Sequence, residues 1–224
     1  MNLIDEIKVN VVRGHIDSNA KYPPDLSGKP GVSELVQKAL TENISPSQIL
    51  NDALIAAMEI VGAKFSAGEY FVPDMLLSAQ AVKTGMKILE PLLVGEESKK
   101  AGTVILGTVK GDMHDIGKNL VKMMLESGGF DVIDLGINTP PEKFVESAKR
   151  YPDAVIGMSA LLSTTMINMK VSIDALRSAG LTNKVIIGGA ATSKKYADEI
   201  KADGYSKDAV QSVQVVKELM GLTV

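Results

Sequence analysis

The feature that most constrains the fold is an alternation in the second half of the chain. Short apolar runs rich in β-branched residues have the composition of strands buried on both faces, and amphipathic segments separate them. The runs are TVILGTV (103–109), FDVIDLG (130–136), DAVIGMS (153–159) and KVIIGGA (184–190). Helices are predicted for the intervening segments at 116–128, 141–149, 165–179 and 193–202. A short fifth strand and a closing helix are predicted within residues 203–220.

This alternation predicts an α/β domain at residues 102–224, built on a doubly wound parallel sheet of five strands. At about 120 residues, the domain is far shorter than the ~250 residues of an eight-stranded barrel. Ligands of open parallel sheets bind at the carboxyl ends of the strands, so functional residues are expected in the loops there.

The first part of the chain has a different rhythm. Apolar residues recur at helical spacing through residues 1–93, and Ser45 followed by Pro46 has the pattern of a helix N-terminus. Four helices fit this stretch, which predicts a small all-α bundle. The stretch 21–31, rich in proline and glycine, is predicted to be a loop. The polar residues 94–101 are predicted to link the two domains.

Composition argues against several classes of function. The formal net charge is −3 and the pI is about 5.5, so no basic face for nucleic acid is indicated. No apolar run approaches the ~18 residues of a membrane helix, and the charged start is unlike a secretory signal. The chain has no cysteine, which rules out disulfides and thiolate metal sites. These features predict a cytoplasmic protein without a membrane or nucleic-acid partner.

The ends of three predicted strands carry small, hydroxylated or acidic residues. The first strand runs into the stretch GTVKGDMHDIGKN, which contains Asp112, His114 and Gly117. The third ends in SALLSTT (159–165), and the fourth ends in GGAATS (188–193). The chain has two histidines, and one of them stands here, two residues after a carboxylate.

A phosphate site is the first alternative, because glycine-rich turns between a strand and a helix often bind phosphate. The detailed pattern does not match. A nucleotide-binding loop has a glycine, four residues and then Gly-Lys-Ser/Thr, whereas Asp112 stands in the place of that glycine and Asn119 follows Gly117-Lys118. A carboxylate at this position would repel a phosphate, so nucleotide binding is disfavoured.

His114 could be a surface or core histidine that satisfies one hydrogen bond, but its neighbours favour metal ligation. An imidazole that ligates a metal usually donates its other N–H to a carboxylate or carbonyl, and Asp112 can supply the carboxylate. A free zinc ion takes three or four protein ligands, which an isolated histidine cannot provide. The other coordination positions would then come from a macrocycle, either haem or a corrinoid. His15, in a charged amphipathic segment, is expected at the surface.

Three motifs in order carry a resemblance to a known family. Asp-x-His-x-x-Gly (112–117), Ser-x-Leu (159–161) and Gly-Gly (188–189) resemble the signature of cobalamin-binding domains that hold the cofactor base-off and His-on. The helical stretch VGAKFSAGEYFVPDMLLSAQAV (61–82) resembles the cap domain of corrinoid proteins in methyltransferase systems, and the α/β half resembles the B12-binding module of methionine synthase. The resemblance covers roughly residues 33–224. It implies a flavodoxin- or Rossmann-like B12-binding domain preceded by a four-helix cap domain, with a cobalt corrinoid as cofactor.

The resemblance implies roles for individual residues. His114 would replace the cofactor's own benzimidazole as lower axial ligand of cobalt, Asp112 would hold the imidazole, and Thr165 would end a proton relay. The methionine-synthase relatives carry serine where this chain has Thr165. Phe65 and Val72 would shield the upper, methyl-bearing face. The slot for the displaced nucleotide tail would be lined by Gly117, Ser159, Leu161, Gly188 and Gly189. The predicted cofactor contacts further include Met113, Asp115, Ile116, Ser163, Thr164 and Ala190.

The same resemblance implies a methyl carrier, a component of a methyltransferase system rather than a stand-alone catalyst. A substrate-specific methyltransferase would deliver a methyl group to Co(I), giving methyl-Co(III). A second methyltransferase would pass it to a thiol or a tetrahydropterin such as tetrahydrofolate, and a reductive activase would restore oxidised cobalt. Two alternatives are the small subunit of a cobalamin-dependent mutase, which lacks a helical cap, and a B12-dependent regulator, which would need a DNA-binding module.

Overall fold

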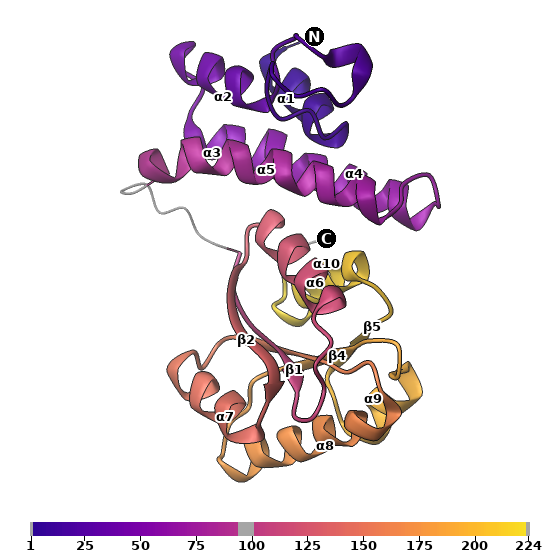
Figure 1. Ribbon diagram of the computed structural model, residues 1–224. Coiled ribbons are helices and arrows are strands. Elements are labelled where there is room, and N and C mark those ends of the chain that lie inside the picture. The colour runs from indigo at the N-terminus through magenta and orange to yellow at the C-terminus, as the bar shows by residue number, and fades with distance from the viewer. Residues whose placement is uncertain (1, 94–100, 223–224) are drawn as a thin grey trace. The chain divides into compact units, whose positions relative to one another are not determined.

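The computed structural model describes residues 2–93 and 101–222. The chain forms two compact units, Met1–Lys99 and Lys100–Val224, each with its own layers of secondary structure (Figure 1). The predicted linker at 94–101 lies outside the described residues except for Ala101.

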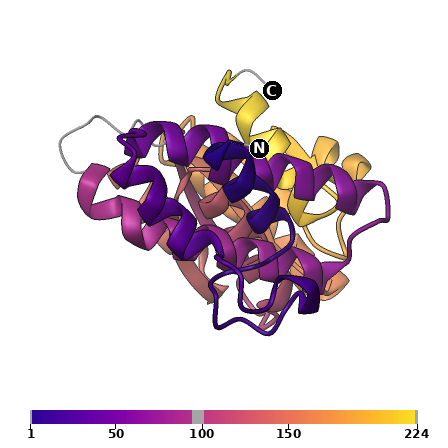
Figure 2. The same ribbon diagram turned by 90° about the horizontal axis from the view of Figure 1, so that it is seen from above.

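The first unit consists of helices that pack side by side (Figure 2). Its described elements are α1 Leu3–Val12, a 3-10 turn Pro24–Leu26, α2 Val32–Thr41, α3 Pro46–Gln48, a π-helical stretch Ile49–Ile55, α4 Ala56–Ser66 and α5 Val72–Leu93. Because α3, the π-helical stretch and α4 follow one another without a break, the described residues form four helical segments, as predicted. The backbone N–H of Gln48 donates to the Ser45 hydroxyl, which is the predicted helix start. Ile7, Leu54 and Met75 are fully buried in the core of this unit.

The second unit alternates strands and helices. Its elements are β1 Thr103–Val109, α6 Ile116–Ser127, β2 Asp131–Thr139, α7 Pro141–Arg150, β3 Val155–Ser159, α8 Ser163–Ser178, β4 Val185–Gly188, α9 Lys194–Glu199, β5 Gly204–Ser206 and α10 Ala209–Leu219. The five strands form one sheet in the order β2-β1-β3-β4-β5, and every pairing is parallel. The predicted doubly wound parallel sheet is confirmed, including the short fifth strand.

Helices cover both faces of this sheet (Figure 1). α6 and α10 pack on one face through an apolar cluster that contains Val104, Leu125, Phe130, Val155, Ile186 and Val216. α7, α8 and α9 pack on the other face, through a larger cluster that contains Ile105, Phe144, Ile156, Met169, Leu176, Ile187 and Ala197. Burial on both faces explains why the strands read as continuous β-branched runs.

The strand order reverses between β1 and β3, because β2 lies on one side of β1 while β3, β4 and β5 follow on the other. Such a switch point leaves a crevice at the carboxyl edge, where ligands of doubly wound sheets bind. The register places Thr108, Ser159, Gly188 and Ser206 in one row across the four strands at this edge. The loops after β1 and β3, which carry the predicted site residues, therefore lie side by side.

His15 corrects one expectation. The residue is fully buried in the first unit rather than exposed, and its Nδ1 lies 2.8 Å from Oδ1 of Asn10. Its backbone N–H also donates to the carbonyl of Asn10, and its carbonyl accepts from the N–H of Val32. The chain turns back at the end of α1 to meet α2, so the charged flanking residues reach solvent while the histidine does not. Amphipathic periodicity does not report such a turn.

Within the described residues, no helix combines the length and the apolar character needed to cross a membrane.

Candidate cofactor site

The loop between β1 and α6 presents His114 at the switch point. The side chain of His114 is 50% exposed, whereas the carboxylate of Asp112 beside it is fully buried. Nδ1 of His114 lies 2.8 Å from Oδ1 of Asp112, and the backbone N–H of His114 donates to the same oxygen at 3.1 Å. A carboxylate partner holds the ring proton on Nδ1, which leaves the lone pair of Nε2 free to ligate a metal.

The second carboxylate oxygen of Asp112 reaches the loop after β3 and the start of α8. Oδ2 accepts hydrogen bonds from the backbone N–H of Leu161 at 2.8 Å and of Leu162 at 3.3 Å. It also accepts from the Thr165 hydroxyl at 2.6 Å. That hydroxyl lies 3.0 Å from the carbonyl of Leu162 as well, but its one proton favours the closer, charged acceptor. His114, Asp112 and Thr165 thus form one connected chain.

These hydrogen bonds determine the charge of Asp112. Burial alone would raise the pKa of its carboxyl, because a charged group is disfavoured away from water. Hydrogen bonds from the Thr165 hydroxyl, from the His114 ring and backbone, and from the Leu161 N–H outweigh burial and hold the pKa far below its usual range. The positive end of the helix dipole at the start of α8 further favours an anion at this place. Asp112 is therefore a carboxylate at neutral pH.

Two residues that sequence analysis did not single out hold the loop in place. The backbone N–H of Gly111 donates to the side chain of Asn138 at 2.7 Å, and the N–H of Asn138 donates to the carbonyl of Asp112 at 2.9 Å. The Thr108 hydroxyl donates to the carbonyl of His114 at 2.9 Å. Thr108 and Asn138 each lie one residue before the end of a strand, β1 and β2. Nothing in the sequence around either residue indicates these contacts.

The structure places the other predicted residues in two groups. Exposed residues surround the His114 loop and the start of α8: Met113, Asp115, Ile116, Gly117, Leu161, Ser163, Thr164, Gly189 and Ala190. Ser159 and Gly188 are half-buried in the edge row of the sheet. Phe65 and Val72 belong to the helical unit, where Phe65 is half-buried in α4 and Val72 is exposed as the first residue of α5. Their predicted role above the cofactor stays a prediction.

Gly189 has a structural requirement of its own. Its φ is +114°, and a Cβ there would lie 2.2 Å from the carbonyl oxygen of Ala160. Only glycine allows β4 to turn this close to the loop after β3. In contrast, a Cβ on Gly117 would meet open space, so packing does not explain the glycine there.

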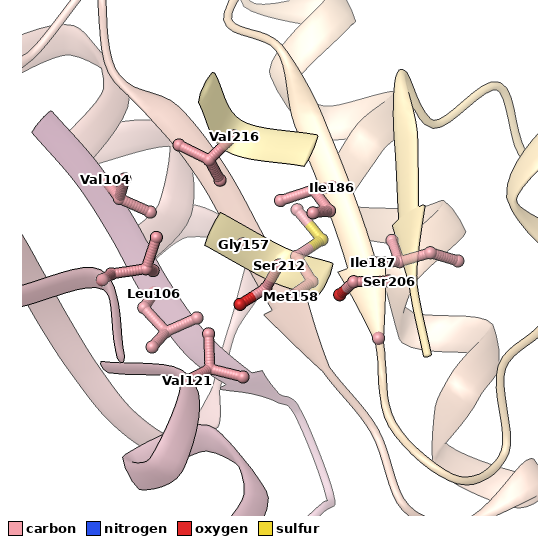
Figure 3. Close-up of a pocket in the computed structure, with 12 residues that line it drawn as sticks. Val104, Leu106, Val121, Gly157, Met158, Ile186, Ile187, Ser206, Ser212 and Val216 are labelled. Carbon is pink, nitrogen blue, oxygen red and sulfur yellow. The ribbon is translucent and has the colours of Figure 1, made fainter. Parts of the chain in front are cut away.

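A small cavity lies between the sheet and helices α6 and α10 (Figure 3). Its volume is about 30 Å³, and its lining includes glycines at 157 and 188 and the hydroxyls of Ser206 and Ser212 among apolar side chains. Of the five residues predicted to line a slot, Gly188 lines this cavity. The space suits about one water molecule.

No group of three or more histidine, cysteine, aspartate or glutamate side chains within the described residues could hold a metal ion. The fold and the site together define a cofactor-binding α/β protein in which a half-exposed imidazole is oriented by a buried carboxylate.

Comparison with known proteins identifies the family. Two models of B12-binding domains match the chain, one at residues 102–214 and another at residues 29–90. A corrinoid protein of Desulfitobacterium hafniense (strain Y51) is 38% identical over 226 residues and covers 99% of both chains. This match includes most of the first 30 residues, where sequence analysis found no resemblance. Dimethylamine corrinoid protein 3 of Methanosarcina acetivorans is 41% identical over 86% of this chain and 91% of its own.

Solved structures agree. The methanol:cobalamin methyltransferase complex MtaBC of Methanosarcina barkeri matches with a TM-score of 0.81 and 27% identity, over 99% of this chain and 81% of that one. A cobalamin-binding protein of Desulfitobacterium hafniense DCB-2 matches with a TM-score of 0.77 and 27% identity, over 98% of both chains. The chain belongs to the corrinoid proteins of methyltransferase systems, and its cofactor is a corrinoid. The predicted family, fold and cofactor are confirmed.

Proposed function

We propose that this chain is a methyl carrier that takes a methyl group from a substrate-specific methyltransferase and delivers it to a second methyltransferase acting on a thiol or tetrahydropterin. The observation that carries the proposal is the connected chain His114–Asp112–Thr165 at the switch point of the sheet. The corrinoid, when bound, supplies the cobalt on which the methyl group travels. The chain supplies the lower ligand, the surface for the ring and the contact with each partner.

His114 is proposed to bind cobalt through Nε2. Its Nδ1 is engaged by a carboxylate that accepts five hydrogen bonds, so the ring is held in one tautomer and one orientation. Because Asp112 stays ionised, the shared proton stays on Nδ1 of His114. The Thr165 hydroxyl donates to Asp112 and stabilises its negative charge. A ligand held in this way needs little reorganisation when the cofactor arrives.

Exposed apolar side chains around His114 fit a flat macrocycle. Met113 is 63% exposed, Ile116 83%, Leu161 42% and Leu162 45%, although large apolar groups are usually buried. Met113 shares the β1–α6 loop with His114, and Ile116 is the first residue of α6. The two leucines lie in the loop before α8. A corrin ring over His114 would cover these apolar side chains.

The cavity beneath α6 and α10 is proposed as the beginning of the slot for the nucleotide tail. Glycine and serine in its lining allow close approach of a bulky group. At about 30 Å³ it is too small for that tail, so α6 and α10 must separate from the sheet when the cofactor enters. Ser159, Leu161 and Gly189 would then contact the tail from the carboxyl edge.

The helical unit is proposed to cover the methyl-bearing face through Phe65 and Val72, and to move aside for each partner. The side chains of Phe71 and Leu76, which lie close to Val72 in sequence, are also exposed, at 66% and 44%. A cytoplasmic location and a reductive activase as third partner belong to the same proposal.

A methylated amine is the methyl donor to test first. Relatives named for dimethylamine are 40–41% identical to this chain, and a relative named for trimethylamine is 38% identical. These relatives belong to methyltransferase systems, which favours the carrier over a mutase subunit.

The decisive experiment loads the purified chain with hydroxocobalamin and reduces it to the Co(II) state. Electron paramagnetic resonance should show nitrogen coupling from an imidazole in place of benzimidazole, and His114→Ala should remove it. His15→Gln is the matched control and should leave the signal unchanged. If the wild-type chain takes up no corrinoid, or keeps benzimidazole on cobalt, the proposal is wrong.

Methyl transfer is then measured directly. The loaded chain is reduced further, to the Co(I) state, and is incubated with a dimethylamine-specific methyltransferase and isotopically labelled dimethylamine, which leaves as monomethylamine. Label should appear on the corrinoid of the wild-type chain, and a mutase subunit would give none.

A further inference from the structure

Lys118 violates two rules of local structure. It is the third residue of α6, where the positive end of the helix dipole disfavours a cation, and its side chain is only 2% exposed. Burying an ammonium group is costly unless all its donors are paired. Such a residue at such a position calls for an explanation, because conflicts with local preference concentrate at functional sites.

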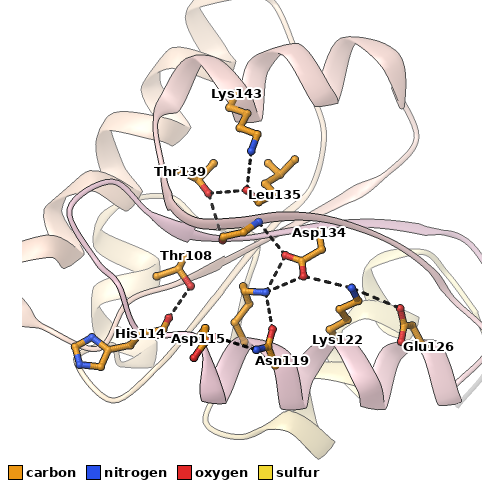
Figure 4. Close-up of polar contacts among 12 residues, drawn as sticks. Thr108, His114, Asp115, Asn119, Lys122, Glu126, Asp134, Leu135, Thr139 and Lys143 are labelled. Carbon is orange, nitrogen blue, oxygen red and sulfur yellow. Dashed lines mark hydrogen bonds and ion pairs between the residues drawn. The ribbon is translucent and has the colours of Figure 1, made fainter.

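The ammonium group is fully paired. Nζ of Lys118 lies 2.8 Å and 2.9 Å from the two carboxylate oxygens of Asp134 in β2, and 2.8 Å from the side-chain oxygen of Asn119. Figure 4 shows Asp134 facing the first turns of α6, with Asn119 and Lys122 beside it. Three acceptors match the three protons of an ammonium group.

Asp134 faces α6 because β2 is irregular at this place. The register with β1 shifts between Leu106, paired with Asp134, and Gly107, paired with Gly136. Gly136 has φ of +82°, and its backbone N–H donates to Oδ1 of Asp134 at 2.9 Å. Bulges of this kind often re-aim a side chain beside a functional site.

Asp134 is ionised in this setting. Burial alone would raise the pKa of its carboxyl, but the hydrogen bond from Lys118 and the N–H of Gly136 hold it below the usual range. Lys122 adds a weaker contact at 3.3 Å. Asp134 therefore meets Lys118 as a carboxylate.

The same segment of β2 holds the His114 loop at both ends. At the front, Asn138 binds the backbone of Gly111 and Asp112. At the C-terminal end of the loop, Asp134 accepts hydrogen bonds from the Lys118 ammonium group, which also donates to the side chain of Asn119. The side chain of Asn119 donates to the carboxylate of Asp115 at 3.1 Å, and its backbone N–H donates to the carbonyl of Asp115 at 2.7 Å.

A purely stabilising role explains this arrangement less well. A buried ion pair often contributes little net stability compared with apolar side chains of similar size, and in some proteins it specifies where two elements meet. The N-cap residue of α6, Asp115, makes no side-chain capping bond, so capping does not fix the start of the helix. We infer that the Lys118–Asp134 ion pair, one turn after His114, fixes the start of α6 instead.

We propose that the Lys118–Asp134 ion pair positions His114 for cobalt by locking the first turn of α6 onto the bulge of β2. That His114 is placed for cobalt rests on the proposed function, whereas the ordering of the loop by the ion pair is independent of the cofactor. Lys118 is a positioning residue and acts through the loop.

Lys118→Met tests the proposal, with Lys122→Met as matched control: the same substitution, four residues further along the helix, on a lysine that also contacts Asp134. In the Co(II)-loaded chain, Lys118→Met should lower the ratio of His-ligated to unligated cobalt about 10- to 100-fold, the range seen for groups that orient metal ligands. Lys122→Met should leave that ratio within about twofold, because its contact is longer and partly exposed.

A second readout needs no cofactor. Amide hydrogen exchange of residues 112–119 in the cofactor-free chain should be at least about tenfold faster in Lys118→Met and unchanged in Lys122→Met. Asp134→Asn, which keeps the size of the side chain, should act in the same direction and carries the test if Lys118→Met does not fold.

The outcomes are separable. If the wild-type chain shows no imidazole nitrogen on cobalt, the proposed function is wrong. The amide exchange data still test whether the Lys118–Asp134 ion pair orders residues 112–119. If both lysine variants keep His ligation and slow exchange, or lose them equally, the positioning role is overturned.

Discussion

Each unit of this molecule holds one histidine, and the two have nearly the same nearest contact. In both, Nδ1 lies 2.8 Å from a side-chain oxygen. His15 in the helical unit faces the neutral amide of Asn10, is fully buried, and has no hydrogen-bond partner within the described residues for Nε2. His114 in the α/β unit faces a carboxylate and is half exposed.

The comparison teaches what makes a histidine a ligand. Burial lowers the pKa of His15, because the imidazolium form is disfavoured away from water. The carboxylates of Glu34, Asp17 and Asp25 oppose this effect in part, and Arg13 reinforces it. His15 is thus a neutral structural residue. An ionised partner and access to a cofactor distinguish His114, rather than the distance to its partner.

The largest expected effect comes from removing the charge that distinguishes the two sites. Asp112→Asn gives His114 the amide partner that His15 has. Loss of the carboxylate should weaken His ligation of cobalt about 10- to 100-fold, because the orienting group of the ligand is lost. The measurement is the His-ligated fraction of the Co(II)-loaded chain. Asp153→Asn, an exposed carboxylate just before β3, is the control, and equal losses in both variants would contradict the comparison.

The second effect tests Thr165, the last member of the hydrogen-bonded series His114–Asp112–Thr165. Thr165→Val removes a hydrogen bond to a buried carboxylate and should lower the free energy of unfolding by about 1.5–3 kcal/mol. Thr165→Ser retains the hydroxyl and should lose less than half as much. Denaturant unfolding of the full chain measures both. If valine, which lacks only the hydroxyl, costs no more than serine, which lacks only the methyl group, the hydrogen bond to Asp112 is not what stabilises this position.

The third effect is the pH dependence of the helical unit. Since folding lowers the pKa of His15 from 6.5, the unfolded chain binds the proton first as pH falls. Stability from this group is complete above pH 6.5 and is lost below it, by at most about 1.4 kcal/mol per pH unit. Amide exchange of α1 in the full chain, corrected for its intrinsic pH dependence, should show this loss. His15→Gln should flatten the profile, and an unchanged slope would disprove the assignment.

The smallest effect comes from the reverse exchange. Asn10→Asp gives His15 a carboxylate partner, which favours the imidazolium form and should reduce the slope below pH 6.5 in the same exchange experiment. At pH 8 the variant should lose roughly 1 kcal/mol, because the Asn10 side chain no longer donates to the carbonyl of Glu6. A steeper slope than that of the wild type would refute this account of His15.

Most of the fold could be predicted from periodicity. Strands such as Val155–Ser159 are buried on both faces, so their composition alone separates them from the amphipathic helices. The short β5, Gly204–Ser206, was predictable because the alternation leaves a place for it. The π-helical stretch Ile49–Ile55 was not, since its sequence has the periodicity of an α-helix.

The site was predictable in part. The order Asp112, His114 indicates a ligand and its orienting carboxylate, and the resemblance adds Thr165. Nothing in the sequence indicates that Lys118 is buried against Asp134, because a lysine one turn into an amphipathic helix normally faces water. Asn138 was missed for a similar reason: its contact with Gly111 joins residues 27 positions apart.

The sequence by itself determined the alternation of strands and helices, the placement of the histidine motif at a strand end, and the absence of thiolate ligands. These are local properties, set by side-chain period and residue type. Only the tertiary structure decided which histidine is buried, which oxygen accepts from Thr165, and which lysine is withdrawn from water. Those outcomes depend on elements distant in sequence meeting at one edge of the sheet, and burial and hydrogen bonding act through space rather than along the chain.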